Sequence, residues 1–447
     1  MSKRRPLGWL LAGLLLLSPL PARANGRFPA ADQILVDPDD TTHLVLRATF
    51  GLLESHDGGR SWSWICEAAV GYSNADPALA LLRGGNVLAG FFGWVSVSAE
   101  QSCQWSTMAL DTRYQYPFDA TLDVADPSRA WLLAVSVDGT RQVHLLSVDG
   151  SGAIGEVLPV GDGFVPVTVE VAPSNPERIY VTGIEENLSS LVLRSDDRGR
   201  TWRRFAVTGH GALPLFISAV DPTDYNRVYA RIDGSGASVA QPAAANDDPS
   251  DHLLVSRDGG ENWETVFSLE TDLLGFALSP DGSRIAVGGP GKGVYVASSA
   301  ELDFQPAAPV RALRCLKWTA DGLFACGQEG LDAWTIGRSL DGGQSFEAFW
   351  HQQDLTPLEC ATSSTTGAVC PATWADVART IDANPDLVSS GGTAGVPEPM
   401  PSPTPGPTSS AGGCAVAVPA PHSPHAWGGL VAALALLGSR RRRRQLP

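Results

Sequence analysis

The feature that most constrains this chain is a short motif, Ser-x-Asp-x-Gly-x-x-aromatic, which occurs four times. The clear copies are SHDGGRSW from Ser55, SDDRGRTW from Ser195, SRDGGENW from Ser256 and SLDGGQSF from Ser339. Three weaker copies lie between them: SAEQSCQW from Ser98, SVDGSGAI from Ser147 and SSAELDF from Ser298. Successive copies start 41 to 61 residues apart. The chain therefore repeats one unit seven times.

Each unit is predicted to be a four-stranded antiparallel sheet. Segments such as VDPTDYNRVYARIDG place Asp-Pro turns between short runs of Val, Leu, Ile and Tyr, and 47 Gly and 33 Pro supply many turns. A period of 40 to 50 residues in a β-rich chain is typical of a propeller with one blade per repeat. We therefore predict an all-β fold, a seven-bladed β-propeller over residues 25–357. The longest spacing contains a polar segment, 233–251, that is expected to be a loop inserted into one blade.

The four clear motifs resemble the Asp-box, or BNR repeat, of sialidases, sortilin-type domains, family-74 glycosidases and photosystem-assembly propellers. The resemblance covers roughly residues 27–355 and implies a propeller of the same general kind as WD40 and YVTN-like repeat domains. In such a turn Asp accepts backbone hydrogen bonds, Gly supplies positive φ and the aromatic ring is buried. The residues expected to hold the turns are Ser55, Asp57, Gly59, Trp62, Ser195, Asp197, Gly199, Trp202, Ser256, Asp258, Gly260, Trp263, Ser339, Asp341, Gly343 and Phe346.

A repeated ion site is the alternative interpretation of the motif. Each copy offers one or two carboxylates, whereas Ca²⁺ takes six to eight oxygen ligands. We therefore expect the motif to be structural, with no metal and no cofactor. The loop GGPGKGVY, 288–295, lacks the Ser or Thr of a phosphate loop and is predicted to be a hairpin.

The first 24 residues have the pattern of a secretory signal peptide. A basic start is followed by an apolar run, and Ala22 and Ala24 occupy the small-residue positions of a cleavage site. After the propeller, 358–390 is expected to form a cap with a short helix over 372–381. Six prolines then mark 391–413 as an extended stalk.

Residues 414–447 resemble the MYXO-CTERM sorting signal, with a Gly-Cys pair at Cys414, a short apolar stretch and the arginine run 440–444. The resemblance implies an envelope sorting protease as a partner and delivery to the cell surface or the medium. It leaves open whether Cys414 is lipidated or removed. A plain single-pass anchor is the alternative, and in either case the membrane is contacted only through this segment.

The remaining six cysteines are candidates for disulfides, as expected for an exported chain. Cys315 and Cys326 face each other across the hairpin around the turn TADG. Cys360 and Cys370 bracket one loop, and elimination then pairs Cys66 with Cys103. No Cys-x-x-Cys pair that would indicate zinc occurs in the sequence.

Charge and motifs narrow the function. The two terminal signals hold nine of the 32 basic residues and none of the 48 acidic ones, so the remainder carries a net charge of −25. Nucleic acid is therefore not an expected partner. A sialidase would need a tyrosine nucleophile, but Tyr180 and Tyr229 occupy equivalent strand positions and are expected in the core.

The sequence favours a non-enzymatic propeller, expected to be a monomer, whose loops bind a protein, a glycan or an envelope component. A divergent glycoside hydrolase of the sialidase or family-74 type is the alternative. That alternative predicts a pair of carboxylates on one face of the central channel. The question of enzyme activity stays open at this stage.

Overall fold

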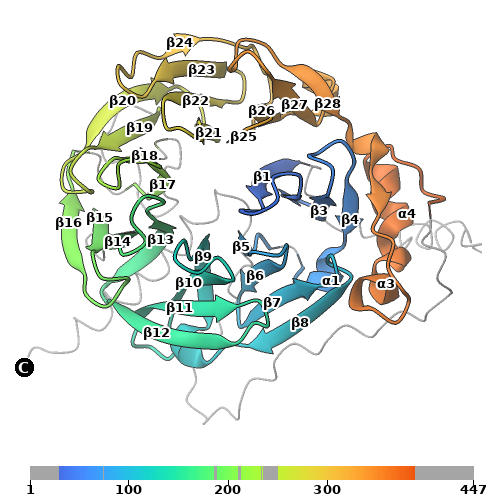
Figure 1. The fold of residues 1–447 in the computed structure, drawn as a ribbon, viewed down its shortest axis with the longest axis horizontal. Coiled ribbons are helices and arrows are strands. Elements are labelled where there is room, and N and C mark those ends of the chain that lie inside the picture. Colours follow the sequence, from blue (N-terminus) through green and yellow to red (C-terminus); the bar gives the residue numbers. More distant parts are fainter. Residues whose placement is uncertain are drawn as a thin grey trace, which may run out of the picture.

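The computed structural model describes residues 30–73, 75–185, 189–209, 213–232, 234 and 250–387. In these residues the chain forms seven sheets arranged in a ring (Figure 1), which confirms the predicted seven-bladed propeller. Blades 1 to 3 consist of β1 (Ala31–Val36), β2 (Leu44–Ala48), β3 (Gly51–Ser55) and β4 (Ser63–Ile65); β5 (Ala78–Leu81), β6 (Val87–Phe91), β7 (Trp94–Ala99) and β8 (Gln104–Ala109); and β9 (Tyr116–Leu122), β10 (Arg129–Val135), β11 (Val143–Asp149) and β12 (Ile154–Gly161).

Blades 4 to 7 repeat the same meander. They consist of β13 (Phe164–Val171), β14 (Ile179–Glu185), β15 (Ser190–Ser195) and β16 (Arg203–Val207); β17 (Leu215–Val220), β18 (Val228–Ile232), β19 (Asp251–Ser256) and β20 (Glu264–Leu269); β21 (Gly275–Leu278), β22 (Arg284–Gly289), β23 (Gly293–Ser298) and β24 (Gln305–Pro306); and β25 (Cys315–Thr319), β26 (Gly322–Cys326), β27 (Ile336–Ser339) and β28 (Glu347–Trp350). The first strand of each blade contacts the first strand of the next, and β1 contacts both β5 and β25. The innermost strands therefore complete the circle.

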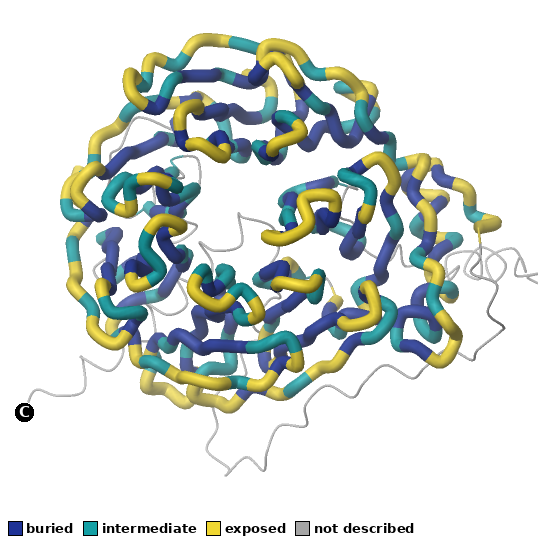
Figure 2. The backbone as a smooth tube through the Cα atoms, viewed as in Figure 1, coloured by how far each residue is buried: buried dark blue, intermediate teal, exposed yellow. Residues whose placement is uncertain are grey.

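The position of a strand within its blade explains its residues. The second strand β10 reads RAWLLAV and is buried along nearly its whole length, because adjacent blades cover both faces of the sheet. The outermost strand β12 is mostly exposed or half-buried. Figure 2 shows the same gradient around the ring, with exposed segments concentrated at the rim and in the turns.

The ring is closed by the end of the described chain rather than by a strand exchanged between the first and last blades. β29 (Thr356–Pro357) adds to β4 in parallel, on the outer edge of blade 1. α3 (Thr365–Val369) and α4 (Pro371–Thr380) then form a cap outside blade 1 (Figure 1). Trp374 of α4 is fully buried, with its ring 5.6 Å from that of Trp64 in β4.

Disulfides fix this cap, and two of the three pairings differ from those expected. Cys315 bonds to Cys326 across β25 and β26 as predicted. The predicted pairings Cys360–Cys370 and Cys66–Cys103 are wrong, because the bonds are Cys66–Cys370 and Cys103–Cys360.

The physical reason lies in the cap. α3 separates Cys360 from Cys370 and packs against both α1 (Glu67–Val70) and β8, so each cysteine meets a different blade. The bridges span 304 and 257 residues. They tie the end of the ring to blades 1 and 2.

Short helices complete the described structure: η1 (Thr112–Tyr114), α2 (Glu329–Asp332) and η2 (Gln352–Asp354). In the part of the chain that the structure describes, none of the helices combines the length and apolar character needed to cross a membrane. The expected signal peptide, the stalk, the sorting segment and nearly all of the 233–251 insertion lie outside the described residues.

Candidate functional site

All seven motif segments form the turn between the third and fourth strands of a blade. In blade 1, the Asp57 carboxylate accepts bonds from the backbone of Arg60 and Ser61 and from the hydroxyls of Ser55 and Ser61, at 2.7–2.9 Å. Burial alone would raise the pKa of Asp57, but these bonds outweigh it and lower the pKa below its usual value. The carboxylate is therefore occupied by its own turn.

The other three clear copies have the same geometry. The carboxylates of Asp197, Asp258 and Asp341 each accept bonds from the residue four positions later and from the motif serine. The glycine at the fifth motif position has positive φ in all four clear copies, for example 85° at Gly260, where a side chain would be strained. The Trp263 ring nitrogen donates to Gly260 O at 3.1 Å. These contacts account for the motif without a ligand.

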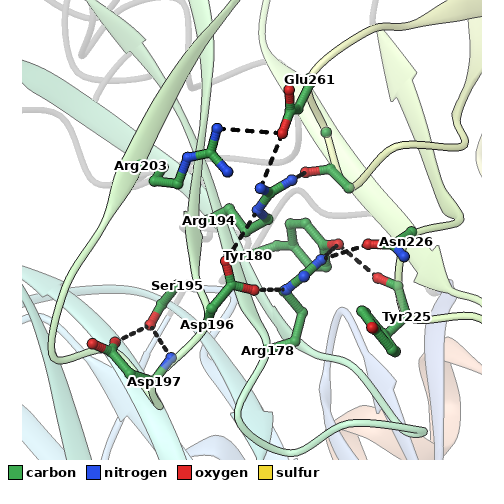
Figure 3. Close-up of polar contacts among 12 residues, drawn as sticks. Arg178, Tyr180, Arg194, Ser195, Asp196, Asp197, Arg203, Tyr225, Asn226 and Glu261 are labelled. Atoms are coloured by element: carbon green, nitrogen blue, oxygen red, sulfur yellow. Dashed lines mark hydrogen bonds and ion pairs between the residues drawn. The ribbon is translucent and has the colours of Figure 1, made fainter.

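Arginines in the motif region connect blades 4 and 5 (Figure 3). Arg194 of β15 is nearly buried, donates to the carbonyls of Asp258 and Gly259 in the blade 5 turn, and lies 3.0 Å from Glu261. Arg178 pairs with Asp196 and donates to Asn226 of blade 5. We call Arg178, Arg194, Asp196 and Glu261 the blade 4 arginine network.

A different set of polar groups couples blades 1, 3, 4 and 7 electrostatically near the axis of the ring, three of them on innermost strands and one on the second strand of blade 1. We call Arg47 (β2), Asp119 (β9), Glu170 (β13) and Lys317 (β25) the axial cluster. Asp119 accepts the backbone N–H of Val169, and Glu170 accepts the hydroxyl of Thr121, so β9 and β13 exchange one bond in each direction. The two carboxylates are therefore neighbours.

The four axial side chains keep partial exposure, but the innermost strands enclose them and limit their hydration. Burial raises the pKa of Asp119 to about 7. Burial and then the charge of Asp119 raise the pKa of Glu170 to about 8, and burial lowers the pKa of Lys317. Both acids therefore keep their protons to a much higher pH than ordinary carboxyl groups do.

Two exposed aromatic rings lie on the face of the ring opposite the seven motif turns, where blades 2 and 3 meet. Phe92 lies in the turn between β6 and β7 with 54% of its surface exposed, and Trp94 begins β7 with 36% exposed. The Phe92 ring packs 5.6 Å from Tyr116, the first residue of β9 in blade 3. The backbone N–H of Gly93 donates to Gln115 O at 2.8 Å, which fixes the turn against the link between the two blades. We call Phe92, Trp94 and Tyr116 the aromatic face.

A third group of residues could bind a metal ion. In the described part of the chain, one set of side chains offers clustered nitrogen and oxygen ligands: His43, Glu54 and His56 of blade 1, with ligand atoms within 4.8 Å of one another. The sequence analysis expected no metal, and this set has no local sequence motif, because its residues come together only through the pairing of β2 with β3. The aromatic face had a readable signal, the string FFGW, in which aromatic residues flank a glycine at a turn.

Comparison with known proteins gives partial similarities only. No protein-family model matches the chain. A segment of 90 residues is 37% identical to the xyloglucanase Xgh74A of Acetivibrio thermocellus, covering 19% of this chain and 10% of that enzyme. The chain thus matches about a tenth of the length of this curated relative.

Solved structures with similar architecture include both hydrolases and repeat propellers. An ancestral GH74 enzyme matches 72% of this chain and 39% of its own, with 12% identity and a TM-score of 0.40. The β-propeller domain of Myceliophteria thermophila Cps50 (Swd1) matches 68% of this chain and 94% of its own, with 12% identity and a TM-score of 0.46.

The tyrosines considered for sialidase chemistry are core residues. Tyr180 and Tyr229 are fully buried in β14 and β18, and the Tyr180 hydroxyl donates to Tyr225 O at 2.6 Å. The described residues form one ring of seven blades. Three disulfides are typical of proteins from oxidising, exported environments.

Proposed function

We propose that this chain is an exported, non-enzymatic propeller that binds glycans through its aromatic face. The observation that carries the proposal is the exposure of Phe92 and Trp94 beside Tyr116 at a rigid turn between blades 2 and 3. Large exposed apolar groups on a folded surface mark interaction sites. Aromatic rings present a flat apolar face that can stack on the C–H face of a sugar ring.

The neighbouring polar groups complement these rings. Arg113, at the link into blade 3, is exposed with its guanidinium held by Asp111 at 3.0 Å, and it lies 5.8 Å from the Tyr114 ring. Such groups can donate hydrogen bonds to hydroxyls at the rim of an apolar platform. The strands β18 and β19 that flank the inserted segment of blade 5 end on the same face of the ring.

The cellular setting follows from the terminal segments. Export by residues 1–24, a stalk over 391–413 and sorting by 414–447 would display the propeller on the cell surface or release it. The negative charge of the mature chain supports an uncharged ligand such as a neutral polysaccharide over an anionic one. The partial identity to a xyloglucanase makes xyloglucan the first ligand to test.

Affinity electrophoresis and calorimetry with xyloglucan and other soluble polysaccharides test the proposal. Trp94→Ala and Phe92→Ala are expected to weaken binding about tenfold or more, because central aromatic contacts dominate interface energies. Leu340→Ala is the control, since this side chain is 74% exposed in the Asp-box turn of blade 7, on the other face. Unaltered binding by both aromatic variants would reject the aromatic face as the site.

A divergent glycoside hydrolase is the second candidate, favoured by the neighbouring carboxylates Asp119 and Glu170. Glycosidases use one protonated and one ionised carboxyl group. Here the pKa values of both acids are raised, to about 7 and about 8, so Glu170 is mostly protonated at neutral pH and Asp119 is ionised only in part. Reducing-sugar release that disappears in Asp119→Asn would support the hydrolase; binding without release would support the glycan-binding propeller.

A further inference from the structure

Blade 1 holds a compact set of side chains that the Asp-box architecture does not require. We call Asp37, His43, Glu54 and His56 the blade 1 histidine cluster. His43 Nε2 lies 2.7 Å from Glu54 Oε1, and His56 Nε2 lies 3.5 Å from the same oxygen. The two imidazole rings stack with their centroids 4.4 Å apart.

The buried carboxylate of Glu54 is only partly satisfied. Glu54 is 2% exposed, and its second oxygen, Oε2, has no hydrogen-bond partner in the described structure. A buried, unpaired carboxylate oxygen is costly unless a donor or a cation meets it. Glu54 Oε2 is therefore available to a further hydrogen-bond donor or to a cation.

The fourth member of the cluster orients His43. Asp37 Oδ2 lies 3.4 Å from His43 Nδ1, which leaves Nε2 directed at Glu54. Histidine ligands of metal ions commonly donate a hydrogen bond from the other ring N–H to a carboxylate, which fixes the orientation of the ring and raises its basicity.

The surroundings leave one side of the cluster open. Gly85, in the turn between β5 and β6 of blade 2, lies against His43, and a Cβ at this position would come within 3.0 Å of the ring. The opposite side is reached through His56, whose side chain is 42% exposed. Solvent can therefore supply a further ligand on the His56 side.

We propose that His43, Glu54 and His56 bind one Zn²⁺ ion, with Asp37 as the carboxylate that positions His43 and water as the fourth ligand. Two imidazoles and one carboxylate with an open position suit zinc, whereas Mg²⁺ prefers an octahedral set of oxygens. At zinc–ligand distances of roughly 2.0–2.2 Å, the ligand atoms must lie closer together than 4.8 Å, and the exposed His56 can move inward. Zinc binds an unprotonated imidazole nitrogen, so any proton on His43 Nε2 is released to solvent when the metal binds.

Zinc titration of the full chain without a histidine tag, after removal of metal with a chelator, tests the site. Calorimetry and elemental analysis are expected to show one high-affinity Zn²⁺ per chain, none of comparable affinity for Mg²⁺, and a rise in Tm on adding ZnCl2. His56→Ala is expected to weaken zinc binding at least about tenfold and to abolish the rise in Tm, while leaving the buried groups in place.

Two further variants separate this site from other zinc-binding groups. Asp37→Asn keeps the Oδ1 acceptor of its turn, changes only the atom that faces His43, and is expected to weaken binding about 10- to 100-fold. His252→Ala removes a histidine of blade 5 and should bind zinc like the wild type. Failure to retain zinc, or equal zinc binding by His56→Ala and the wild type, would overturn the proposal.

Discussion

Blades 1 and 4 carry different ionisable residues at three equivalent positions of the backbone. Asp37 N donates to His43 O in blade 1, as Ala172 N donates to Arg178 O in blade 4. The residues before and after the motif serine are Glu54 and His56 in blade 1, and Arg194 and Asp196 in blade 4. One blade places two imidazoles around a carboxylate, and the other places two guanidiniums around one.

The difference lies in what each cluster connects. The blade 4 arginines reach into blade 5 and satisfy its carbonyls, so the network holds two blades together. The blade 1 cluster keeps an unsatisfied carboxylate oxygen, and blade 1 is fastened instead by the cap and its disulfides. Because a disulfide fastens blade 1, its charged residues are not needed to hold the blade in the ring.

The largest expected effect is on closure of the ring at blade 1. Replacing Cys66 and Cys370 together with serine should lower the free energy of unfolding by about 4 kcal/mol, because with Cys103–Cys360 intact the bridge still closes a loop of about 47 residues, 37 from Cys66 to Cys103 and 10 from Cys360 to Cys370. Replacing Cys315 and Cys326, which are 11 residues apart, should cost about 3 kcal/mol. Urea unfolding measures both variants; equal losses would show that the cap does not stabilise the ring through this bond.

The second prediction removes the blade 4 arginine network. Arg194→Ala should lower the free energy of unfolding by about 2–3 kcal/mol, because the buried carbonyl of Gly259 and the partly buried carbonyl of Asp258 lose their charged donor. The acidic partners Asp196 and Glu261 are partly exposed, so water compensates part of the loss. Arg203→Ala, which removes an exposed arginine 3.5 Å from Glu261, should cost less than about 1 kcal/mol. Similar losses in both variants would contradict a special role for Arg194.

The sequence predicted the structural features that all blades share but not those that differ from blade to blade. The motif spacing predicted the seven blades, and the hairpin register predicted Cys315–Cys326, because both depend on local pattern. The other two disulfides depend on where α3 and α4 dock, which sequence separation does not reveal.

The same limit applies to the candidate sites. His43 and Glu54 are 11 residues apart and meet only because β2 and β3 pair in register, with Leu44 opposite Ser55. Asp119 and Glu170 lie in separate blades and meet at the axis. Contacts of this kind require the assembled ring.

The third prediction concerns the motif aspartate, which blades 1 and 4 share. Asp57→Ala and Asp197→Ala should each lower the free energy of unfolding by about 1–2 kcal/mol, because each carboxylate accepts equivalent bonds within its turn. The exposed Asp303, in a weak motif copy, is the control and should change stability little on replacement with alanine. Markedly unequal losses at Asp57 and Asp197 would show that the turns are not equivalent.

Acid sensitivity supports the same comparison. The pKa of each motif aspartate is lowered by hydrogen bonds in its turn, against the effect of burial. The folded state therefore binds fewer protons than the unfolded state, and this part of the stability is present above pH ~4 and is lost as the pH falls through the folded pKa. The alanine variants should differ less from the wild type in acid than at neutral pH.

The smallest expected effect lies at the axis, where blade 4 contributes Glu170 and blade 1 contributes Arg47. The pKa of Glu170 is raised to about 8, so the folded state binds more protons than the unfolded state between roughly pH 4.5 and 8. Stability due to this group falls as the pH rises through that interval, and the lowered pKa of Lys317 opposes the trend only above its own folded pKa. Because Glu170 keeps partial exposure, which reduces the energetic effect of its raised pKa, Glu170→Gln should reduce the decline by only about 1 kcal/mol between pH 5 and pH 8.

Arg47→Met should change the pH dependence in the opposite direction. The charge of Arg47 lowers the pKa of Asp119 against the effect of burial, so its removal should raise that pKa further and steepen the loss of stability with rising pH. Thermal unfolding at both pH values measures the two slopes, with Glu264→Gln on the exposed outer strand as the control. If both variants reduced the loss of stability with rising pH, the axial cluster would titrate as one coupled group. Glu170 of blade 4 and Arg47 of blade 1 would then not have the opposite effects expected here.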